Sequence, residues 1–276
     1  MAVKPLDRSL GVAIAASRAR GIPLLADVDD PDLENRLSLH SPLRFLAKLV
    51  LRPRRTFSSL RLRRHVKFLP SIVSNPWLQT RYGGVIVPHA REDTGDGSPH
   101  VSQQISVVFV GTNREHKGVS DLRDAVARMQ DNGVTLTVTD EKPIDAQPWE
   151  SWVGHVPFER GIQLVKDADV VIIPSRMSSN AHGQLPAKLM DAMLAGRAIG
   201  VSNIAPMPWA LGGSGLLFAP GDVAEIQRTL TRLLDPAART ELGKAARTHA
   251  LTNFTVDACA SSFREACESA ISGARL

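Results

Sequence analysis

The chain has 276 residues, of which 43% are apolar, and this suffices for one large or two small hydrophobic cores. Charged residues make up 22% of the chain and its net charge is +5, so a highly charged, disordered composition is excluded. Cys259 and Cys267 stand too far apart to pair along one helix, which excludes a disulfide framework and favours a reducing compartment. No apolar run approaches the ~20 residues of a membrane span, and the N-terminus lacks the apolar core of a signal peptide. We therefore expect a cytoplasmic protein.

Residues 1–90 predict a partial α/β domain. Ile22–Asp27 predicts a strand that ends in the acidic turn Asp27-Val28-Asp29-Asp30-Pro31. Ser71–Ser74 and Val85–Val87 predict two further short strands. We find no strand ahead of Ile22, so this domain is expected to be smaller than a full doubly wound domain.

The middle of this domain is strongly basic, since no Asp or Glu occurs from Asn35 to Arg91. Cations alternate there with leucines in an amphipathic pattern that Pro53 interrupts. The pattern fits an anionic membrane surface, an acidic or lipid-phosphate acceptor, and equally a solvated helix pair with one core-facing side. Only 5% of the chain is aromatic and no nucleic-acid-binding motif is present, so we expect no nucleic-acid partner.

Residues 91–104 are polar and rich in turn formers, and they predict an interdomain linker. Strands and helices alternate after it, over residues 105–252, as in a doubly wound parallel sheet. We expect strands over 105–110, 134–139, 169–173, 197–201 and 215–218, and helices over 117–131, 158–167, 184–195, 222–234 and 236–250. Residues 253–276 form a separate C-terminal segment in which Val256–Ile271 predicts a helix.

Two strand-loop-helix segments contain the candidate ligand-binding residues. In the first, the buried strand Val170–Ile173 leads through a polar loop to a helix opened by Pro186. Main-chain amides around Gly183–Ala187 would face an anion, and Lys188 and Asp191 lie on one face of the helix. This geometry suits a ligand with phosphate at one end and hydroxyl groups at the other.

In the second segment the strand Ser106–Val110 is followed by Gly111-Thr112-Asn113-Arg114-Glu115-His116-Lys117-Gly118. A helix with apolar residues at i, i+3, i+4 and i+7 comes next, from Leu122 to Met129. Cations in such a loop can hold phosphate, although on their own they are also compatible with a solvated helix start.

These segments resemble the retaining GT-B-fold glycosyltransferases of the group 1 family. Residues 183–199 resemble the motif G-x-P-x-K-x-x-E-x-M-x-x-G-x-P-V, and residues 111–118 resemble G-(R/T)-x-x-x-x-K-G. A third match, at residues 215–222, resembles the turn G-L-L-V-x-P-G-D. The three matches occur in the family's order over roughly 150 residues.

The resemblance implies a GT-B-like α/β fold with a complete C-terminal Rossmann-like domain and a partial N-terminal, acceptor-side domain. The terminal helix is expected to cross back to the first domain. Compared with ordinary domain sizes the N-terminal part is short by ~100 residues. Either the gene start is truncated or the protein is a reduced form that uses a partner.

The resemblance also implies roles for individual residues. Lys117 and Arg114 would hold the donor diphosphate, Asp191 would accept hydrogen bonds from the ribose, and Asp29 or Asp30 would face the acceptor. The donor-binding residues that it implies are Gly111, Gly183, Gln184, Leu185, Lys188 and Asp191. One departure stands out, because the family's first acid, which contacts the donor sugar, is replaced by Gly183. The resemblance implies no metal ion and no cofactor.

The first functional hypothesis is a hexosyltransferase-like enzyme that transfers a sugar from a nucleotide-diphosphate sugar with retention and without a metal. Its acceptor is a sugar, a lipid-linked molecule or another small molecule. The alternative is a non-catalytic, nucleotide-sugar-binding auxiliary subunit. A third hypothesis, a sugar-nucleotide epimerase, requires catalytic acids and a histidine that the sequence does not place.

Overall fold

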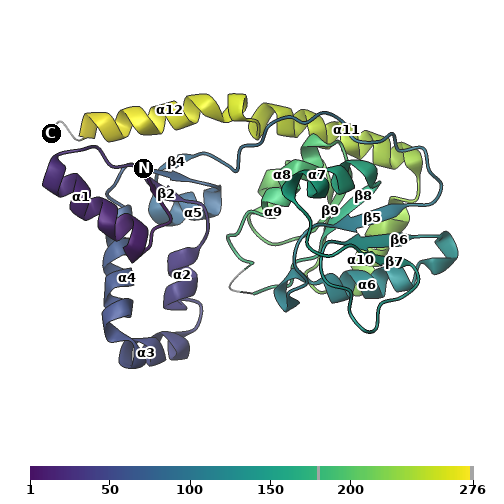
Figure 1. The fold of residues 1–276 in the computed structure, drawn as a ribbon, viewed down its shortest axis with the longest axis horizontal. Coiled ribbons are helices and arrows are strands. Elements are labelled where there is room, and N and C mark those ends of the chain that lie inside the picture. The colour runs from purple at the N-terminus through teal and green to yellow at the C-terminus, as the bar shows by residue number, and fades with distance from the viewer. Residues whose placement is uncertain (179–180, 274–276) are drawn as a thin grey trace. The chain divides into compact units, whose positions relative to one another are not determined.

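The computed structural model describes residues 1–178 and 181–273, and the chain divides into two compact units (Figure 1). The first unit contains Met1–Ala90, His182–Leu185 and the helix that begins at Val256. The second unit contains Arg91–Ala181 and Pro186–Thr255. Each unit is built on its own parallel sheet, which confirms the predicted α/β class.

The first unit has a sheet of order β1-β2-β3-β4 with parallel neighbours throughout. Its strands are β1 (Ala2–Val3), β2 (Ala26–Val28), β3 (Ser71–Val73) and β4 (Val85–Ile86). A π-helical turn at Asp7–Gly11 precedes the helices, which are α1 (Val12–Arg20), α2 (Asp32–Leu37), α3 (Pro42–Leu51), α4 (Pro53–Val66), α5 (Pro76–Tyr82) and α12 (Val256–Gly273).

Helices cover both faces of this sheet. On one face Val28 packs with Leu62 of α4 and Leu78 of α5 in the main core of the unit. On the other face Ile72 packs with Ala266 of α12. The last helix of the chain is therefore an integral layer of the first unit, because without it the apolar side chains on that face would lie in water.

The strands of this unit differ from the predicted ones at the N-terminal end. The strand expected at Ile22–Asp27 begins only at Ala26, and the expectation that no strand precedes Ile22 was wrong, because Ala2–Val3 pairs with it in register Ala2↔Ala26. A two-residue strand has no periodicity that a sequence pattern could reveal.

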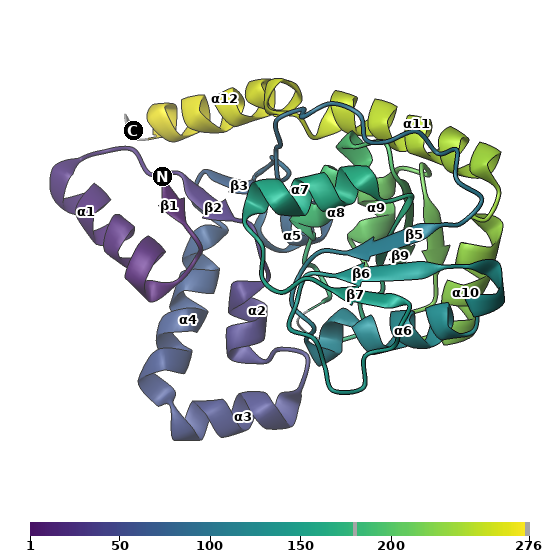
Figure 2. The ribbon, with the colours of Figure 1, turned by 45° about the vertical axis from the view of Figure 1, so that its right-hand side comes forward.

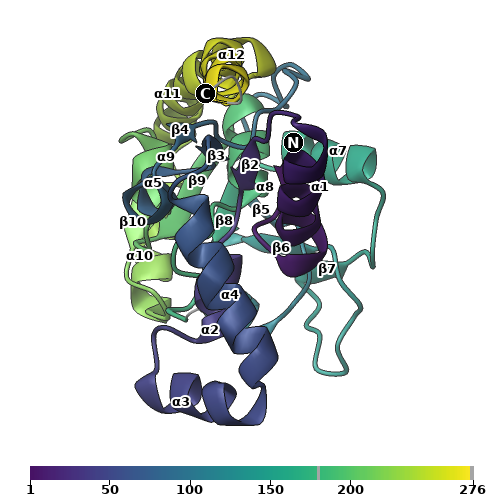
Figure 3. The ribbon, with the colours of Figure 1, turned by 90° about the vertical axis from the view of Figure 1, so that its left-hand side faces the viewer.

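The basic stretch forms two helices separated by a proline break. Pro53 cannot donate a backbone hydrogen bond, so α3 ends before it and α4 begins at it, where proline is well tolerated. Ser41 caps the start of α3 by accepting a hydrogen bond from the amide of Arg44. Figure 3 shows α3 at the end of α4 that lies away from the sheet of this unit.

The second unit has a six-stranded parallel sheet of order β10-β9-β8-β5-β6-β7. Its strands are β5 (Ser106–Phe109), β6 (Thr135–Val138), β7 (Glu150–Trp152), β8 (Val170–Ile173), β9 (Ala198–Ser202) and β10 (Leu216–Phe218). Its helices are α6 (Val119–Ala127), α7 (Phe158–Asp167), α8 (Ala187–Leu194), α9 (Met207–Leu211), α10 (Val223–Arg232) and α11 (Pro236–Asn253), with 3-10 turns at Glu115–Lys117 and Gln130–Asn132.

The helices of this unit lie on both faces of its sheet, with α6 and α10 on one side and α7, α8 and α11 on the other (Figure 2). The strand order reverses between β8 and β5, because the chain winds outward from β5 in one direction and from β8 in the other. Loops that follow these two strands therefore diverge and leave room for a ligand at the carboxyl edge.

Two predicted helices of this unit start later than expected. The helix expected over 117–131 is interrupted at Gly118, whose φ of +67° ends the 3-10 turn before α6 begins at Val119. The helix expected over 184–195 begins only at Ala187. Strand β7 and helix α9 were not predicted, since both are short and lie among turn-forming residues.

Residues 91–104, expected as a linker, are instead part of the second unit. The amide of Arg91 donates to the carbonyl of Phe254 at 2.8 Å, and that of Gly97 donates to Ala195 at 3.0 Å. Asp93 forms an ion pair with Arg247 of α11 at 2.8 Å. Polar, turn-rich composition alone does not show whether such hydrogen bonds go to water or to the protein.

Gly118 is under two constraints that can be separated by mutation. Its φ is positive, and a Cβ atom there would lie 1.8 Å from the carbonyl oxygen of Pro174. Gly154 has a similar φ of +70° but nothing within 4 Å of its Cβ position. We predict that Gly154→Ala costs ~1–2 kcal/mol of unfolding free energy, from backbone strain alone.

Gly118→Ala should cost at least ~2 kcal/mol more than Gly154→Ala, because the loop must also move away from the end of β8. Urea unfolding of the two variants measures the difference. Equal losses would contradict the close approach of Gly118 to Pro174.

Candidate functional site

A pocket of about 360 Å³ lies at the carboxyl edge of the second unit's sheet, where the strand order reverses. This volume lies in the range of small-molecule sites. The pocket is lined by residues that follow β5, β6 and β7 and by residues of α7 and α8: Val110, Gly111, Thr112, Thr139, His155, Val156, Pro157, Phe158, Gly161, Ile162, Val165, Lys188 and Asp191.

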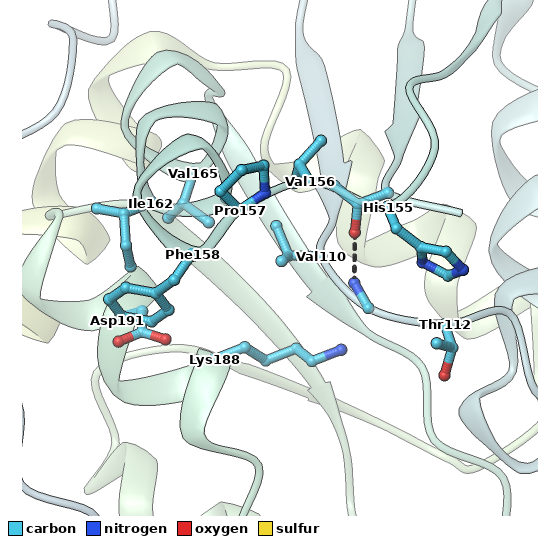
Figure 4. Close-up of a pocket in the computed structure, with 13 residues that line it drawn as sticks. Val110, Thr112, His155, Val156, Pro157, Phe158, Ile162, Val165, Lys188 and Asp191 are labelled. Carbon is cyan, nitrogen blue, oxygen red and sulfur yellow. Dashed lines mark hydrogen bonds between the residues drawn. The ribbon is translucent and has the colours of Figure 1, made fainter. Parts of the chain in front are cut away.

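The lining divides into an apolar wall and a polar side (Figure 4). The wall comes from the start of α7 and the residues before it, and includes Pro157, Phe158 and Ile162. Hydroxyl groups and charges come from the ends of β5 and β6 and from α8. The amide of Gly111 donates to Oγ1 of Thr139 at 2.7 Å, which ties two of the contributing loops together.

Lys188 is the cation of this pocket. Its ammonium lies 4.0 Å from the centre of the Phe109 ring, and a Cβ atom at Gly111 would lie 2.5 Å from its Nζ. Burial, and then the nearby charge of Lys117, lower the pKa of Lys188 to about 7. Without an anion the side chain is therefore close to half protonated at neutral pH.

Asp191 lies one helical turn after Lys188 and lines the same pocket. Its Oδ1 accepts a hydrogen bond from Nε of Arg91 at 2.8 Å. The backbone of Arg91 is itself fixed, since its amide donates to Phe254. The carboxylate is thus held in one orientation by a residue that was expected to lie in a linker.

Lys117 and Arg114 lie in the loop after β5 but do not line the pocket. Lys117 ends the 3-10 turn and is half-buried, whereas Arg114 is exposed. Burial, followed by the charges of Lys117 and Arg114, lowers the pKa of His116. Glu115 acts on His116 in the opposite direction, but the two cations outnumber it, so the loop from Gly111 to Gly118 carries a net positive charge.

The segment His182–Leu185 packs within the first unit. Nδ2 of Asn75 donates to the carbonyl of Gly183 at 3.1 Å, and Gln184 donates to Asp30 at 3.4 Å. Gly183 has a φ of +86°, and a Cβ atom there would lie 2.4 Å from the indole of Trp77. The position of the family's first acid is therefore one that only glycine can occupy in this conformation.

Asp29 follows β2 at the carboxyl edge of the first sheet. Its carbonyl accepts a hydrogen bond from Oγ of Ser74 at 2.6 Å, while its own Oδ1 is buried and has no hydrogen-bond partner. Asp27, which the sequence did not single out, has a pKa raised to about 6 by burial and then by the charge of Asp29, with Lys4 acting in the opposite direction.

Of the predicted donor-binding residues, the structure brings Gly111, Lys188 and Asp191 together in one pocket. The apolar wall and Arg91 were missed. The exposure of Phe158 at the start of α7, which is 61%, is known only from the structure, so the sequence offered no signal for this wall. Nothing in the sequence around Arg91 indicates a carboxylate partner a hundred positions away.

Within residues 1–178 and 181–273, no group of three or more His, Cys, Asp or Glu side chains is arranged to hold a metal ion. No helix in these ranges is long and apolar enough to cross a membrane.

Comparison with known proteins agrees with this geometry. The profile of the family described as Glycosyl transferases group 1 matches residues 104–236. This part of the chain is a group 1 glycosyltransferase domain. A 2-deoxystreptamine glucosyltransferase of Streptomyces kanamyceticus is 30% identical over 145 residues, which cover 47% of this chain and 36% of that protein. The match thus spans little more than a third of the relative's length.

Solved structures extend the likeness to both units. HepE of Anabaena, determined with UDP and glucose, has a TM-score of 0.72 at 18% identity and is matched over 97% of this chain and 77% of its own. Sucrose-phosphate synthase of Thermosynechococcus elongatus has a TM-score of 0.68 at 17% identity, over 96% and 78%. This likeness confirms the GT-B fold of the group 1 domain and its companion unit.

The lowered pKa of Lys188 gives the pocket a testable pH dependence. An anionic ligand binds best to protonated Lys188, and the second phosphate ionisation, near ~6, is complete above neutrality. We predict that the affinity for UDP falls by ~10-fold or more between about pH 7 and about pH 9 in the wild-type protein. The isosteric variant Lys188→Met should bind more weakly and show little pH dependence, as calorimetry at each pH would measure.

A second readout needs no ligand. Because the pKa of Lys188 lies below its usual value of 10.5, the folded state binds fewer protons than the unfolded state from about pH 7 to 10.5. Stability should therefore rise across this window in the wild type, and less so in Lys188→Met. An identical pH profile of the two melting temperatures would contradict the assignment.

Proposed function

We propose that this protein transfers a sugar from a nucleotide-diphosphate sugar, and that the pocket of the group 1 domain binds the donor. The observation that carries the proposal is the convergence of Gly111, Lys188 and Asp191 at the reversal point of the sheet. A buried ammonium, a positively charged loop and a fixed carboxylate offer complementary partners for diphosphate and ribose. HepE, which has the same fold, was determined with UDP and with UDP-glucose, so a UDP-sugar is the first donor to test.

In this proposal each part of the pocket takes one part of the donor. The apolar wall from Val156 to Val165 packs against the base. Asp191 accepts hydrogen bonds from the ribose hydroxyl groups, and Lys188 with Lys117 and Arg114 neutralises the diphosphate. In the family, this segment lies beside the donor sugar. Here Gly183 and Gln184 would contact the sugar through backbone groups, and Leu185 would hold their loop in place.

We further propose that the reaction retains the anomeric configuration and needs no metal ion. The bond from the sugar C1 to the phosphate oxygen breaks, a bond from C1 to the acceptor oxygen forms on the same face, and the acceptor proton moves to the leaving phosphate. In such a route the protein's main task is to stabilise the developing phosphate charge, which cations can do without a metal. Asp29 would orient the acceptor hydroxyl, and the acceptor is a sugar, a lipid-linked molecule or another small molecule.

One observation favours a second function, that of an auxiliary nucleotide-sugar-binding subunit. Gly183 replaces the sugar-contacting acid, and the ring of Trp77 occupies the space where a side chain would begin. Donor binding could then survive without transfer. Calorimetry with UDP-glucose, paired with an assay for UDP release in the presence of candidate acceptors, separates the two. Binding without UDP release under every condition favours the auxiliary subunit, and no binding overturns both.

The diphosphate role of Lys117 predicts a selective loss. We expect Lys117→Ala to weaken UDP binding by ~1.5–3 kcal/mol while changing uridine binding little, because uridine has no phosphate to pair with the ammonium. The charge-matched control is Lys244→Ala on α11, which belongs neither to the loop after β5 nor to the pocket lining. Titration calorimetry with both ligands tests this, and equal losses for UDP and uridine would rule out a phosphate contact.

The ribose role of Asp191 predicts a loss of discrimination. We expect Asp191→Asn to weaken UDP binding but to leave binding of 2′,3′-dideoxy-UDP nearly unchanged, because an amide accepts hydrogen bonds less well than a carboxylate. The control is Arg91→Gln, which removes the ion pair but keeps the carboxylate. If Asp191→Asn still prefers UDP over the dideoxy compound as strongly as the wild type, the carboxylate does not contact ribose.

A further inference from the structure

A second pocket, of about 110 Å³, lies in the first unit where α2, α3 and α4 meet. Its lining is entirely basic and hydroxylic: Arg36, Lys48, Arg52, Arg55, Thr56 and Ser59. No carboxylate is among these lining residues, whereas four of them are cationic: Arg36, Lys48, Arg52 and Arg55. Mutual repulsion of this kind is relieved when an anion binds.

The charges at this pocket are only partly compensated by the protein. The ammonium of Lys48 donates to the carbonyls of Asn35 and Arg36 and to Oγ of Ser38, so it caps the end of α2. Burial, followed by the charges of Arg52, Arg55 and Arg44, lowers its pKa. Arg36 pairs with Asp7 through Nη2 at 3.1 Å, but its Nε is buried without a hydrogen-bond partner.

Helix α3, which contributes Lys48 to this pocket, turns an apolar face outward. Leu43, Leu46 and Val50 follow one another at i, i+3 and i+7, and their exposed fractions are 81%, 55% and 77%. Residues with this spacing form one stripe along a helix. In an ordinary surface helix such a stripe packs on the core, whereas here it faces solvent.

Helix α4 carries a second exposed stripe, of mostly positive charge, on a face other than the one that lines the basic pocket. Arg54, Phe57, Arg61 and Arg64 are exposed and follow one another at helical spacing. The phenylalanine is 61% exposed. Arg63 lies outside this stripe and forms an ion pair with Glu34 at 3.5 Å. The exposed cations of α4 therefore keep their charge available to a partner.

We propose that α3 and α4 form a docking surface for an anionic lipid bilayer. The basic pocket takes the phosphate of a lipid headgroup, and Leu43, Leu46 and Val50 enter the boundary between headgroups and acyl chains. A free phosphate would leave the apolar stripe in water, and so would a nucleic acid, whereas a bilayer offers both chemistries at adjacent depths. The inference does not rest on the proposed sugar transfer, since it concerns residues of the first unit alone.

The test is sedimentation of the full chain with vesicles of phosphatidylglycerol and phosphatidylcholine, compared with vesicles of phosphatidylcholine alone. We expect at least ~10-fold tighter binding to the anionic vesicles at low salt and release as salt is raised. Arg52→Gln/Arg55→Gln should weaken this binding by ~30-fold, about fivefold for each arginine. The charge-matched control Arg18→Gln/Arg20→Gln, on exposed residues of α1, should change it less than ~3-fold.

A separate variant tests the apolar stripe of α3. Leu43→Ser/Leu46→Ser/Val50→Ser should weaken binding by at least ~10-fold, whereas Val12→Ser, at a valine 61% exposed on α1, should not. Circular dichroism and calorimetry with UDP report folding and the donor site separately. A variant that keeps both but loses vesicle binding supports the proposal whether or not sugar transfer is found.

Three results would overturn the proposal. One is equal binding of the wild-type protein to anionic and neutral vesicles, or binding to neither. Another is an equal loss in the pocket variant and its α1 control, which would indicate diffuse net charge. The third is binding of inorganic phosphate by the pocket, lost in Arg52→Gln/Arg55→Gln, with no effect of either variant on vesicles; the pocket would then serve a free phosphate compound.

Discussion

The ammonium of Lys188 occupies a space that exists because residue 111 has no side chain. Any Cβ there would lie 2.5 Å from Nζ, and the centre of the Phe109 ring lies 4.0 Å from the same atom. Sheet order brings the end of β5 next to β8, and α8 then carries the lysine to that edge. The cost of burying this charge appears as its lowered pKa, and an anion in the pocket would recover that cost. The fold thus places a buried ammonium where binding of a negatively charged ligand is favoured, in the pocket of the second unit.

The departure from the family pattern at Gly183 has a physical cause within the first unit. Trp77 presses against the backbone of this glycine, Asn75 holds its carbonyl, and Arg81 covers the indole ring at 3.3 Å. An acid could be restored only if the indole moved and the backbone left its positive φ. The loss of the acid is therefore coupled to a specific packing arrangement within the first unit.

The basic stretch from Asn35 to Arg91 fits several interpretations as a sequence. They can be separated only when it is known which face of each helix is buried. A solvated helix pair would turn its leucines inward, and α4 does so with Leu62. Helix α3 does the opposite with Leu43 and Val50. The difference follows from the break at Pro53, because a helix that starts afresh is free to present another face. The same break gathers Arg52 and Arg55 beside Lys48.

The sequence by itself determined the α/β class, the alternation that builds the second sheet and the membership of residues 104–236 in the group 1 family. These depend on local signals, namely apolar runs and short motifs such as Lys117-Gly118 and the three-residue spacing of Lys188 and Asp191. Tertiary structure alone decided that Arg91 holds Asp191, that a wall at Phe158 completes the pocket, and that residues 91–104 pack on the second unit. It also decided the strand at Ala2–Val3 and the outward face of α3. Each of these joins residues far apart in the chain or depends on which side of an element meets water, and neither is encoded in a local pattern.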